Sequence, residues 1–263
     1  MAYLYETHLH TAGVSKCAIS RGADYVVPYI DKGYTGIIVT DHFYNGNCML
    51  SRKLPWREWV NRFCHGYEEA KEEGDKRGLD VFFGWEETFD GCDDYLIYGL
   101  DKEWLFDHPE VRSWTRGEQY RIVKEAGGCV VQAHPFRQRH YIPRIILSTS
   151  CVDAVEVANG GHEDVSSDAL AFRYAKKIGK AITAGTDIHD ASDILYAELF
   201  GVYLDRKLTS IADYVKMILN NEIAGVKTDE GRLDFHGTET VKFPVEIRDK
   251  DDRIIRRNWK EFI

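Results

Sequence analysis

The sequence predicts an α/β fold, and more specifically a barrel of about seven βα units. Three observations support this prediction. Short apolar runs alternate along the chain with longer amphipathic segments. Most of these short runs are almost continuously apolar, as is typical of parallel strands that are buried on both faces. The length of 263 residues is also close to that of α/β barrels, which commonly form one domain of roughly 200–250 residues.

Each expected strand coincides with a short apolar run. The strands are expected at Tyr3–Tyr5, Gly36–Thr40, Val81–Trp85, Tyr95–Tyr98, Cys129–Gln132, Ala154–Val157 and Ala181–Ala184. Helices are expected at Ala23–Lys32, Trp56–Arg77, Arg116–Ala126, Asp164–Ile178 and Ser210–Asn220. Glycines directly after several of these segments support the helix ends, because glycine easily takes the left-handed conformation that stops a helix.

The last part of the chain has a different character and divides the predicted organisation into two parts. Residues 1–226 carry the alternating strands and helices. Residues 227–263 are expected to form a small C-terminal extension on the same domain, with Lys242–Ile247 and Arg253–Ile255 as the two strands of a hairpin.

Composition favours a globular protein of the cytoplasm that binds neither a membrane nor duplex nucleic acid. Hydrophobic residues make up 44% of the chain and charged residues 29%, which are ordinary globular values. The net charge of −9 disfavours a nucleic-acid binder, which usually has a basic patch, but it allows a nucleotide as substrate. No signal peptide or apolar run of membrane-spanning length is recognisable. The six cysteines form no CxxC pair and are expected to be free thiols in a reducing compartment.

The functional signal is a set of five motifs, each at or just after the end of an expected strand. In chain order they are HLH (His8, His10), TDH (Asp41, His42), GWEE (Glu86, Glu87), QAHP (His134) and GTDIH (Asp187, His189). Residues i and i+2 of a strand share one face, so the first two imidazoles would point the same way. In α/β barrels the carboxyl ends of the strands form the active-site rim. Imidazoles and carboxylates together suit Zn²⁺, Mn²⁺ or Fe²⁺, and this many donors exceed the needs of one ion.

The ordered motifs HLHT, TDH, GWE, AHP and GTDIH closely resemble those of the PHP (polymerase and histidinol phosphatase) domain family, over residues 4–225. The resemblance implies a distorted barrel of seven βα units and a metal-dependent phosphoesterase with two or three divalent ions. It implies that the first ion is held by His8, His10, Glu86 and Asp187, the second by Glu86 and His134, and the third by His42 and His189. Glu87 is an alternative to Glu86, but the GxE pattern of the family favours Glu86.

Two segments depart from the family pattern. Many relatives carry an acidic residue or a histidine a few positions after HxHT, whereas Ala12–Cys17 offers no carboxylate or imidazole and Lys16 would bring a positive charge there instead. Many relatives also carry a histidine at the start of the strand after Glu86. This chain has Asp93-Asp94 at that point, and Asp94 is the expected replacement ligand. A hard oxygen ligand there would favour Mn²⁺ or Mg²⁺.

The predicted catalytic set is Asp41, His42, Arg137 and Asp187. The resemblance implies that a hydroxide bridging two ions attacks the phosphorus atom in line with the leaving group. Arg137 could grip the phosphate through paired hydrogen bonds, or it could be a solvated surface arginine. Asp41 could orient His42 or transfer a proton, or it could be a hydrogen-bond partner behind the metal ligands.

The leading hypothesis is therefore a cytoplasmic, metal-dependent phosphoesterase whose partner is a small phosphorylated substrate. One alternative is a metal-dependent hydrolase of another bond, such as an amide, because similar barrels with similar ligands serve that chemistry. The other is a non-catalytic, regulatory PHP domain whose site has lost a ligand. The sequence contains no GxSxG, GxxxxGK[ST], HExxH or GxGxxG motif that would favour a different enzyme class.

Overall fold

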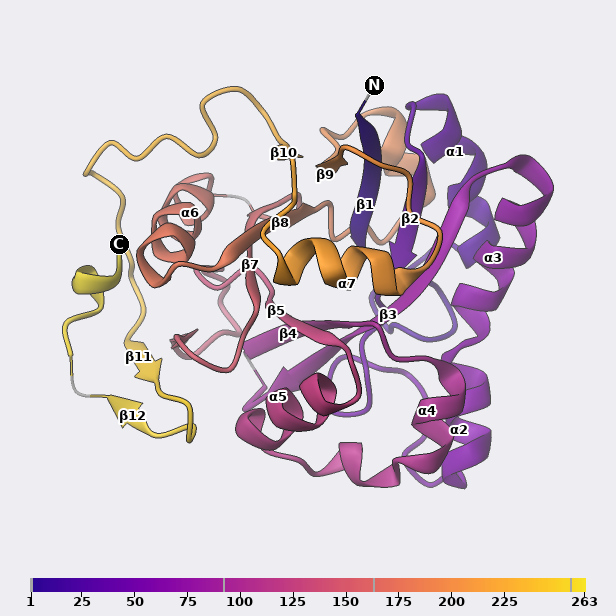
Figure 1. The fold of residues 1–263 in the computed structure, drawn as a ribbon, viewed down its shortest axis with the longest axis horizontal. Coiled ribbons are helices and arrows are strands. Elements are labelled where there is room, and N and C mark those ends of the chain that lie inside the picture. The colour runs from indigo at the N-terminus through magenta and orange to yellow at the C-terminus, as the bar shows by residue number, and fades with distance from the viewer. Residues whose placement is uncertain (1, 92, 163, 256) are drawn as a thin grey trace.

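The computed structural model describes residues 2–91, 93–162, 164–255 and 257–263. Its centre is a nine-stranded sheet that curls into a nearly closed barrel, with the strand order β10-β9-β1-β2-β3-β4-β5-β7-β8 (Figure 1). The strands are β1 (Tyr3–Leu9), β2 (Gly36–Val39), β3 (Asp80–Phe89), β4 (Asp93–Tyr98), β5 (Cys129–Gln132), β7 (Ala154–Asn159), β8 (Ala181–Gly185), β9 (Gly201–Leu204) and β10 (Gly225–Lys227). Every strand that the apolar runs predict is present, and the predicted α/β barrel is confirmed.

The barrel closes where the first strand meets the segment that follows β8. The amide of Asp187 donates to the carbonyl of His8 at 2.8 Å, and the amide of His10 donates to the carbonyl of Ile188 at 3.0 Å. At the start of β1, residues Tyr3–Tyr5 pair instead with the antiparallel strand β9. The first and last sequence motifs therefore lie side by side at the rim where the parallel strands end.

One strand of the barrel runs against the expected direction. β1, β2 and β3 are parallel, as are β5, β7 and β8, but β4 pairs antiparallel with both β3 and β5. Only residues 90–92 join β3 to β4, and so short a link can form only a hairpin. A parallel pair would need a crossover of roughly a dozen residues. The prediction of a parallel strand was therefore wrong for β4, whose first residues, and not its last, lie at the rim that carries the sequence motifs.

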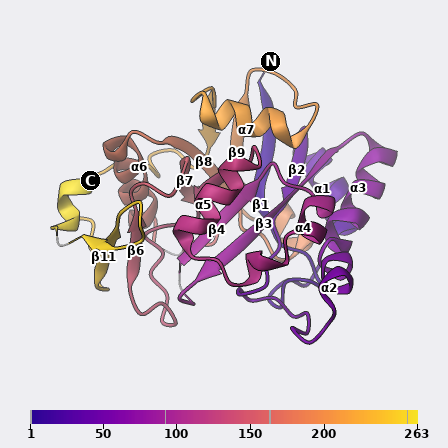
Figure 2. The same ribbon diagram turned by 60° about the horizontal axis from the view of Figure 1, so that its bottom comes forward.

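Helices surround the barrel (Figures 1 and 2). They are α1 (Val26–Asp31), α2 (Trp56–Phe63), α3 (His65–Arg77), α4 (Lys102–Asp107), α5 (Arg116–Glu125), α6 (Ser166–Ile178) and α7 (Ile211–Leu219). The helix expected at Trp56–Arg77 is interrupted at Cys64, so the prediction of one helix was wrong. After the interruption, Gly66 of α3 packs so closely on Thr11 that an added Cβ would lie 2.7 Å from the Thr11 Cβ.

Helix α7 covers the end of the barrel opposite the motifs. Its Tyr214 packs edge-on against Tyr98 of β4, with 5.2 Å between the ring centroids. The Tyr98 hydroxyl in turn donates to the carbonyl of Thr7 on β1 at 2.7 Å. Tyr5 and Met217 belong to the same buried cluster. This end of the barrel is therefore filled by side chains.

The C-terminal residues form a small second sheet with β6 (Ile145–Ser148), a strand that was not among those expected. β11 (Val245–Arg248) pairs antiparallel with β12 (Ile254–Ile255) and parallel with β6. The 3₁₀ turn Trp259–Phe262 contacts α6. The division of the chain near residue 227 stays a prediction.

Two expectations from composition concern thiols and membranes. The cysteines that the structure describes are free thiols at positions 17, 48, 64, 129 and 151, while Cys92 lies outside the described residues. Within the described ranges, no helix combines the length and apolarity that crossing a bilayer requires.

Gly185, the last residue of β8, allows β8 to approach β1 at the point of closure. A Cβ at this position would lie 2.4 Å from the Cβ and 2.9 Å from the backbone nitrogen of His8. We expect Gly185→Ala to lower the free energy of unfolding by about 1–3 kcal/mol, because the backbone of β1 must shift. Urea unfolding in the presence of a chelator measures this difference.

Gly225→Ala is the matched control, because no described atom lies within 4 Å of the Cβ it would add. Equal stability of the two alanine variants would contradict the close approach of the two strands.

Candidate metal centre

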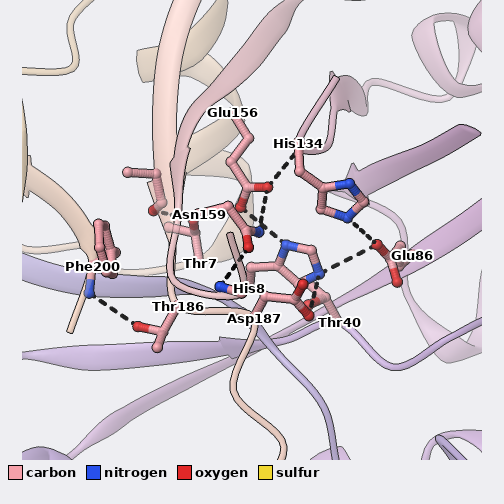
Figure 3. A network of polar contacts seen from close by, with 12 residues as sticks. Thr7, His8, Thr40, Glu86, His134, Glu156, Asn159, Thr186, Asp187 and Phe200 are labelled. Atoms are coloured by element: carbon pink, nitrogen blue, oxygen red, sulfur yellow. Dashed lines mark hydrogen bonds and ion pairs between the residues drawn. The ribbon is translucent and has the colours of Figure 1, made fainter. Parts of the chain in front are cut away.

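Donor atoms of four buried side chains converge at the point of barrel closure, and Figure 3 shows three of them, His8, Glu86 and Asp187. The Nε2 atom of His8 lies 3.4 Å from Glu86 Oε1 and 3.5 Å from Asp187 Oδ1. The Nε2 atom of His10 lies 3.0 Å from Asp187 Oδ1 and 3.6 Å from Glu86 Oε2. Ligand atoms about 2.1 Å from a tetrahedral cation are about 3.4 Å from one another. These four side chains therefore outline a site for one divalent cation.

A second cluster shares Glu86 with the first. The Nε2 atom of His134 lies 3.1 Å from Glu86 Oε1 and 3.9 Å from Asp94 Oδ2. The remaining Asp94 oxygen accepts a hydrogen bond from the Thr88 hydroxyl at 2.6 Å. Asp94 reaches this cluster because the antiparallel strand β4 begins at the rim, where the parallel strands end. The structure thus brings the expected replacement ligand into contact with the expected second site.

The third cluster consists of imidazoles. One ring nitrogen from each of His10, His42 and His189 lies within 4.8 Å of the other two. The ring of His10 stacks on that of His42 at 4.3 Å and on that of His189 at 4.6 Å between centroids. The Nδ1 atom of His42 is also 2.6 Å from Glu86 Oε2. Glu86 therefore faces members of all three clusters.

The hydrogen bonds behind His8 and His10 show why a cation fits between them. The Nδ1 atom of His8 lies 3.0 Å from Glu156 Oε1, and a carboxylate can only accept a hydrogen bond. The Nδ1 atom of His10 lies 3.1 Å from the Ser15 hydroxyl, which donates its own proton to Asp41. Both imidazoles are thus assigned Nδ1–H, and their Nε2 atoms lie 3.1 Å apart. Against burial, Glu156, Asp187 and Glu86 raise the pKa of His8 well above its usual value, so in the chain without ions His8 can carry a second proton and donate it to His10. A cation between the two nitrogens would take the place of this proton.

Burial opposes charge throughout the centre, so neighbouring groups decide which side chains ionise. Burial alone would raise the pKa of Glu86, but His42 and His8 outweigh it and hold this pKa well below its usual range. Burial lowers the pKa of His134 to about 4 and, together with His42, lowers the pKa of His10. Glu86 is therefore a carboxylate, and His10 and His134 are neutral, which are the forms that bind a metal ion.

Other features of the same donors also fit cations. In the chain without ions, burial and then the Glu86 charge raise the pKa of Asp94 to about 7, because two carboxylates face one space. The buried Glu86 Oε2 lies 2.6 Å from the Nδ1 atom of His42 and 3.6 Å from the Nε2 atom of His10, so it faces two imidazoles at once. His134 and Asp187 have φ angles of 30° and 55°, a strained conformation for residues other than glycine. These side chains are held in place at a local conformational cost, as ligands often are.

Glu156 on β7 is a part of the centre that the motifs do not reveal (Figure 3). It orients His8 through Oε1, and its other oxygen accepts the backbone N–H of His134 at 3.1 Å and the Asn159 amide at 2.9 Å. A carboxylate in this position fixes the imidazole tautomer and raises its basicity. In the sequence, the sign of a special role for Glu156 is that it is the one charged residue within the apolar run AVEV.

Asp41 lies behind His10, on the side away from the converging donor atoms. Its carboxylate accepts hydrogen bonds from the Thr11 amide at 2.6 Å and the Ser15 hydroxyl at 2.6 Å. Ser15 also accepts the backbone N–H of His42 at 3.0 Å. This arrangement fits the interpretation of Asp41 as a partner behind the metal ligands, and its direct role in catalysis stays a prediction.

Arg137 lies against the centre, and its side chain is only 13% exposed. Its Nη2 atom donates to Asn159 at 2.7 Å and to the carboxylate of Asp187. The interpretation as a solvated surface arginine does not fit this burial. Arg137 borders a cavity of about 660 Å³ over the three clusters, whose other walls include Asn45, Thr88, Arg139, His140 and Tyr141. This volume is sufficient for a small organic substrate.

Glu87 points away from the three clusters and is not a competitor of Glu86 in this structure. It is fully buried and accepts hydrogen bonds from the Thr88 amide and the Asn45 side chain at 3.3 and 3.4 Å. Burial raises the pKa of Glu87 to about 8. The folded chain therefore holds this carboxyl in its protonated form at neutral pH.

A titration of stability should reveal the protonated Glu87. Because its folded pKa exceeds the unfolded value, its stabilising contribution is complete below about pH 4.5 and is lost as the pH rises through about 8. We expect Glu87→Gln to remove a decline of up to about 1.4 kcal/mol per pH unit in this interval. Urea unfolding of the chelator-treated protein from pH 5 to pH 9 measures the slope.

Glu222→Gln, which alters an exposed carboxylate paired with Arg206, should leave the wild-type slope unchanged. Parallel curves for wild type and Glu87→Gln would show that Glu87 is ionised in the folded protein.

The barrel and the three donor clusters at its rim define the class of this protein as an α/β barrel with a candidate centre for several metal ions. Neither a scan against protein-family models nor a search of curated proteins found a match. Solved structures with the same fold do match. One is a two-domain protein from Bacteroides vulgatus that contains a predicted PHP-like metal-dependent phosphoesterase (TM-score 0.59, 16% identity). The match covers 84% of this chain and 64% of that protein.

A second similar structure is that of a predicted metal-dependent phosphoesterase from Bifidobacterium adolescentis. It has a TM-score of 0.54 and 16% identity, and the match covers 83% of this chain and 96% of that one. The chain thus has the fold of PHP-like metal-dependent phosphoesterases. At this level of identity the similarity concerns the fold.

Proposed function

We propose that the protein is a metal-dependent phosphoesterase that hydrolyses a small phosphate ester, using two or three divalent ions of zinc, manganese or iron. The observation that carries the proposal is the convergence of His8, His10, Glu86 and Asp187, whose donor atoms are 3.0–3.6 Å apart beside a largely buried arginine. The fold shared with PHP-like phosphoesterases supports the same assignment.

The donor clusters divide into three sites that share ligands. His8, His10, Glu86 and Asp187 would hold one ion, and Glu86 with His134 and Asp94 would hold a second. His42 and His189 would hold a third. When bound, such ions activate water for in-line attack and neutralise the charge on the phosphoryl oxygens.

The residues around the clusters would prepare the site for an anion. Glu156 and Ser15 keep the ring protons of His8 and His10 on Nδ1, so that both Nε2 atoms remain available as donors. Asn159 and Asp187 anchor the guanidinium of Arg137 through Nη2. An anchored guanidinium at the cavity wall can bind a phosphoryl oxygen with little loss of side-chain freedom. We further propose a small phosphorylated molecule as the partner and the cytoplasm as the location.

A substrate screen tests the proposal. The protein, purified and loaded with Mn²⁺, is assayed with p-nitrophenyl phosphate, histidinol phosphate and nucleotides. Phosphate release is expected from the wild type and from Glu222→Gln, an exposed control. It should be lost in His10→Ala and Asp187→Ala. Unchanged activity in the two alanine variants would reject the assignment.

The same preparation separates the alternatives. Turnover of amide substrates without turnover of phosphate esters would identify a hydrolase of another bond. Less than one equivalent of bound metal, together with no turnover of either class, would identify a non-catalytic domain.

A further inference from the structure

The guanidinium of Arg137, at the wall of the cavity, is held through only one of its three nitrogens among the contacts described. Its Nη2 atom donates to Asn159 Oδ1 at 2.7 Å and to the carboxylate of Asp187. The Nε atom is buried and has no hydrogen-bond partner among the described residues. Because a buried donor without a partner is costly, this guanidinium has capacity for an anionic ligand. Its direction depends on the two acceptors of Nη2, of which only Asn159 is not itself a candidate metal ligand.

Asn159, the last residue of β7, is fixed at both its side chain and its backbone. Its side-chain amide donates to Glu156 at 2.9 Å (Figure 3), and its Oδ1 atom also accepts the Gly161 amide at 2.8 Å. Its backbone N–H donates to Asp168 of α6 at 3.2 Å. Its backbone carbonyl accepts a hydrogen bond from Nη2 of Arg232 at 3.1 Å. The support of Asn159 therefore extends beyond the barrel.

Arg232 belongs to the segment that follows the last barrel strand, β10, yet only 8% of its side chain is exposed. Its Nε atom donates to the fully buried carboxylate of Asp168, and its Nη1 atom donates to Asp229 at 3.0 Å. The guanidinium carbon lies 4.6 Å from the ring centroid of Phe200. One planar group thus binds the Asp168 carboxylate and the Asn159 carbonyl at once, which the single ammonium of a lysine is too compact to reproduce.

We propose that Arg232 is a positioning residue for phosphate binding: through Asn159, it holds the guanidinium of Arg137 in the orientation that binds a phosphoryl group. The contacts run from Arg232 to the backbone of Asn159, and from the Asn159 side chain to Arg137. The segment after β10 is therefore part of the active site, although none of its described residues lines the cavity. The inference rests on the proposed function, which supplies the phosphate that Arg137 binds.

Phosphate binding tests the proposal without turnover. Inorganic phosphate is titrated into the full chain, loaded with Mn²⁺ and freed of excess metal, and Kd is measured by calorimetry. Arg232→Lys keeps a cation beside Asp168 but loses the bridge to Asn159, and it is expected to raise Kd about tenfold with unchanged metal content. Arg253→Lys is the matched control, because this arginine of the same segment is 70% exposed and pairs with Asp249. It should bind phosphate like the wild type.

A double-mutant cycle separates positioning from a general loss of structure. If Arg232 acts through Arg137, then Arg232→Lys has no further effect on Kd once Arg137 is replaced by lysine. A merely structural role would raise Kd by the same factor in both backgrounds. Asp229→Asn is a milder second variant, because Asp229 is 36% exposed and contacts only Nη1 of Arg232 among the contacts described. It is expected to raise Kd about threefold, again only while Arg137 is present.

Three results would overturn the proposal: wild-type affinity for phosphate in both Arg232→Lys and Asp229→Asn, equal factors in the two backgrounds, or no phosphate binding by the wild type. Assays of phosphate esters with the same preparations distinguish this inference from the proposed function. Phosphate binding that shows the coupling, without turnover of any ester, would refute the proposed function alone. Turnover of esters without the coupling would refute this inference alone.

Discussion

Glu86→Gln is expected to lower kcat/KM for a phosphate ester by about 10³-fold, equivalent to about 4 kcal/mol of transition-state stabilisation. The carboxylate is 1% exposed and faces all three donor clusters, with contacts of 3.4 Å to His8, 3.1 Å to His134 and 2.6 Å to His42. The amide keeps the shape of the side chain but removes its charge and one of its two acceptor oxygens. Steady-state kinetics on the metal-loaded protein measures the effect.

The bound metal should fall together with the activity. Elemental analysis is expected to find at least one equivalent fewer in Glu86→Gln than in the wild type, because the first two clusters share this carboxylate. Glu87→Gln is the matched control, since it makes the same chemical change one residue later on a side chain that points away from the clusters. Wild-type metal content and activity in Glu86→Gln would refute the shared-ligand arrangement.

Arg116→Met is expected to lower the free energy of unfolding by about 3–5 kcal/mol at neutral pH, because it leaves a buried carboxylate without its cation. Arg116, at the start of α5, is 4% exposed and donates to Asp93 at 2.7 Å, to Asp90 at 2.8 Å and to Asp252 at 3.1 Å. The Asp93 side chain is itself 4% exposed. Urea unfolding followed by circular dichroism measures the loss.

The ion pairs of Arg116 also hold residues next to the candidate metal centre in place. Asp93 directly precedes the candidate ligand Asp94, and Asp252 belongs to the C-terminal extension, so one guanidinium ties the rim to the tail. We expect the variant to bind its second metal ion more weakly as well. Arg62→Met is the control, because Arg62 is exposed and pairs only with Glu58 four residues away among the contacts described, and its loss should cost no more than about 0.5 kcal/mol. Equal stability of the two methionine variants would show that the buried network is dispensable.

The barrel strands were predictable because burial on both faces leaves a direct trace in the sequence. Runs such as GIIV and CVV contain no polar position, and each became a buried strand. The direction of β4 left no such trace. Its run YLIY is as apolar as the others, and the direction follows from the short link at residues 90–92, which the pattern of apolar runs does not weigh.

Other features of the fold depend on tertiary contacts. The run IILS of β6 is buried and rich in isoleucine, so its strand character could be read from the sequence, but its pairing with β11, about a hundred residues away in the chain, could not. The close packing of Gly66 on Thr11, two residues after the interruption at Cys64, is likewise a contact between distant segments. Such contacts join distant segments, and a local pattern does not contain them.

By itself, the sequence determined the kinds of donor and their order along the chain: imidazoles and carboxylates placed at the ends of buried strands. This information was sufficient to predict a metal site, because ligand chemistry depends on residue type and strand ends can be located from local hydrophobicity. Only the tertiary structure decided which donors face one another, that Glu86 and not Glu87 turns inward, and that Glu156 and Ser15 lie beside the histidines. The physical reason is that these relations depend on barrel closure, which places residues far apart in the chain within a few ångströms of one another.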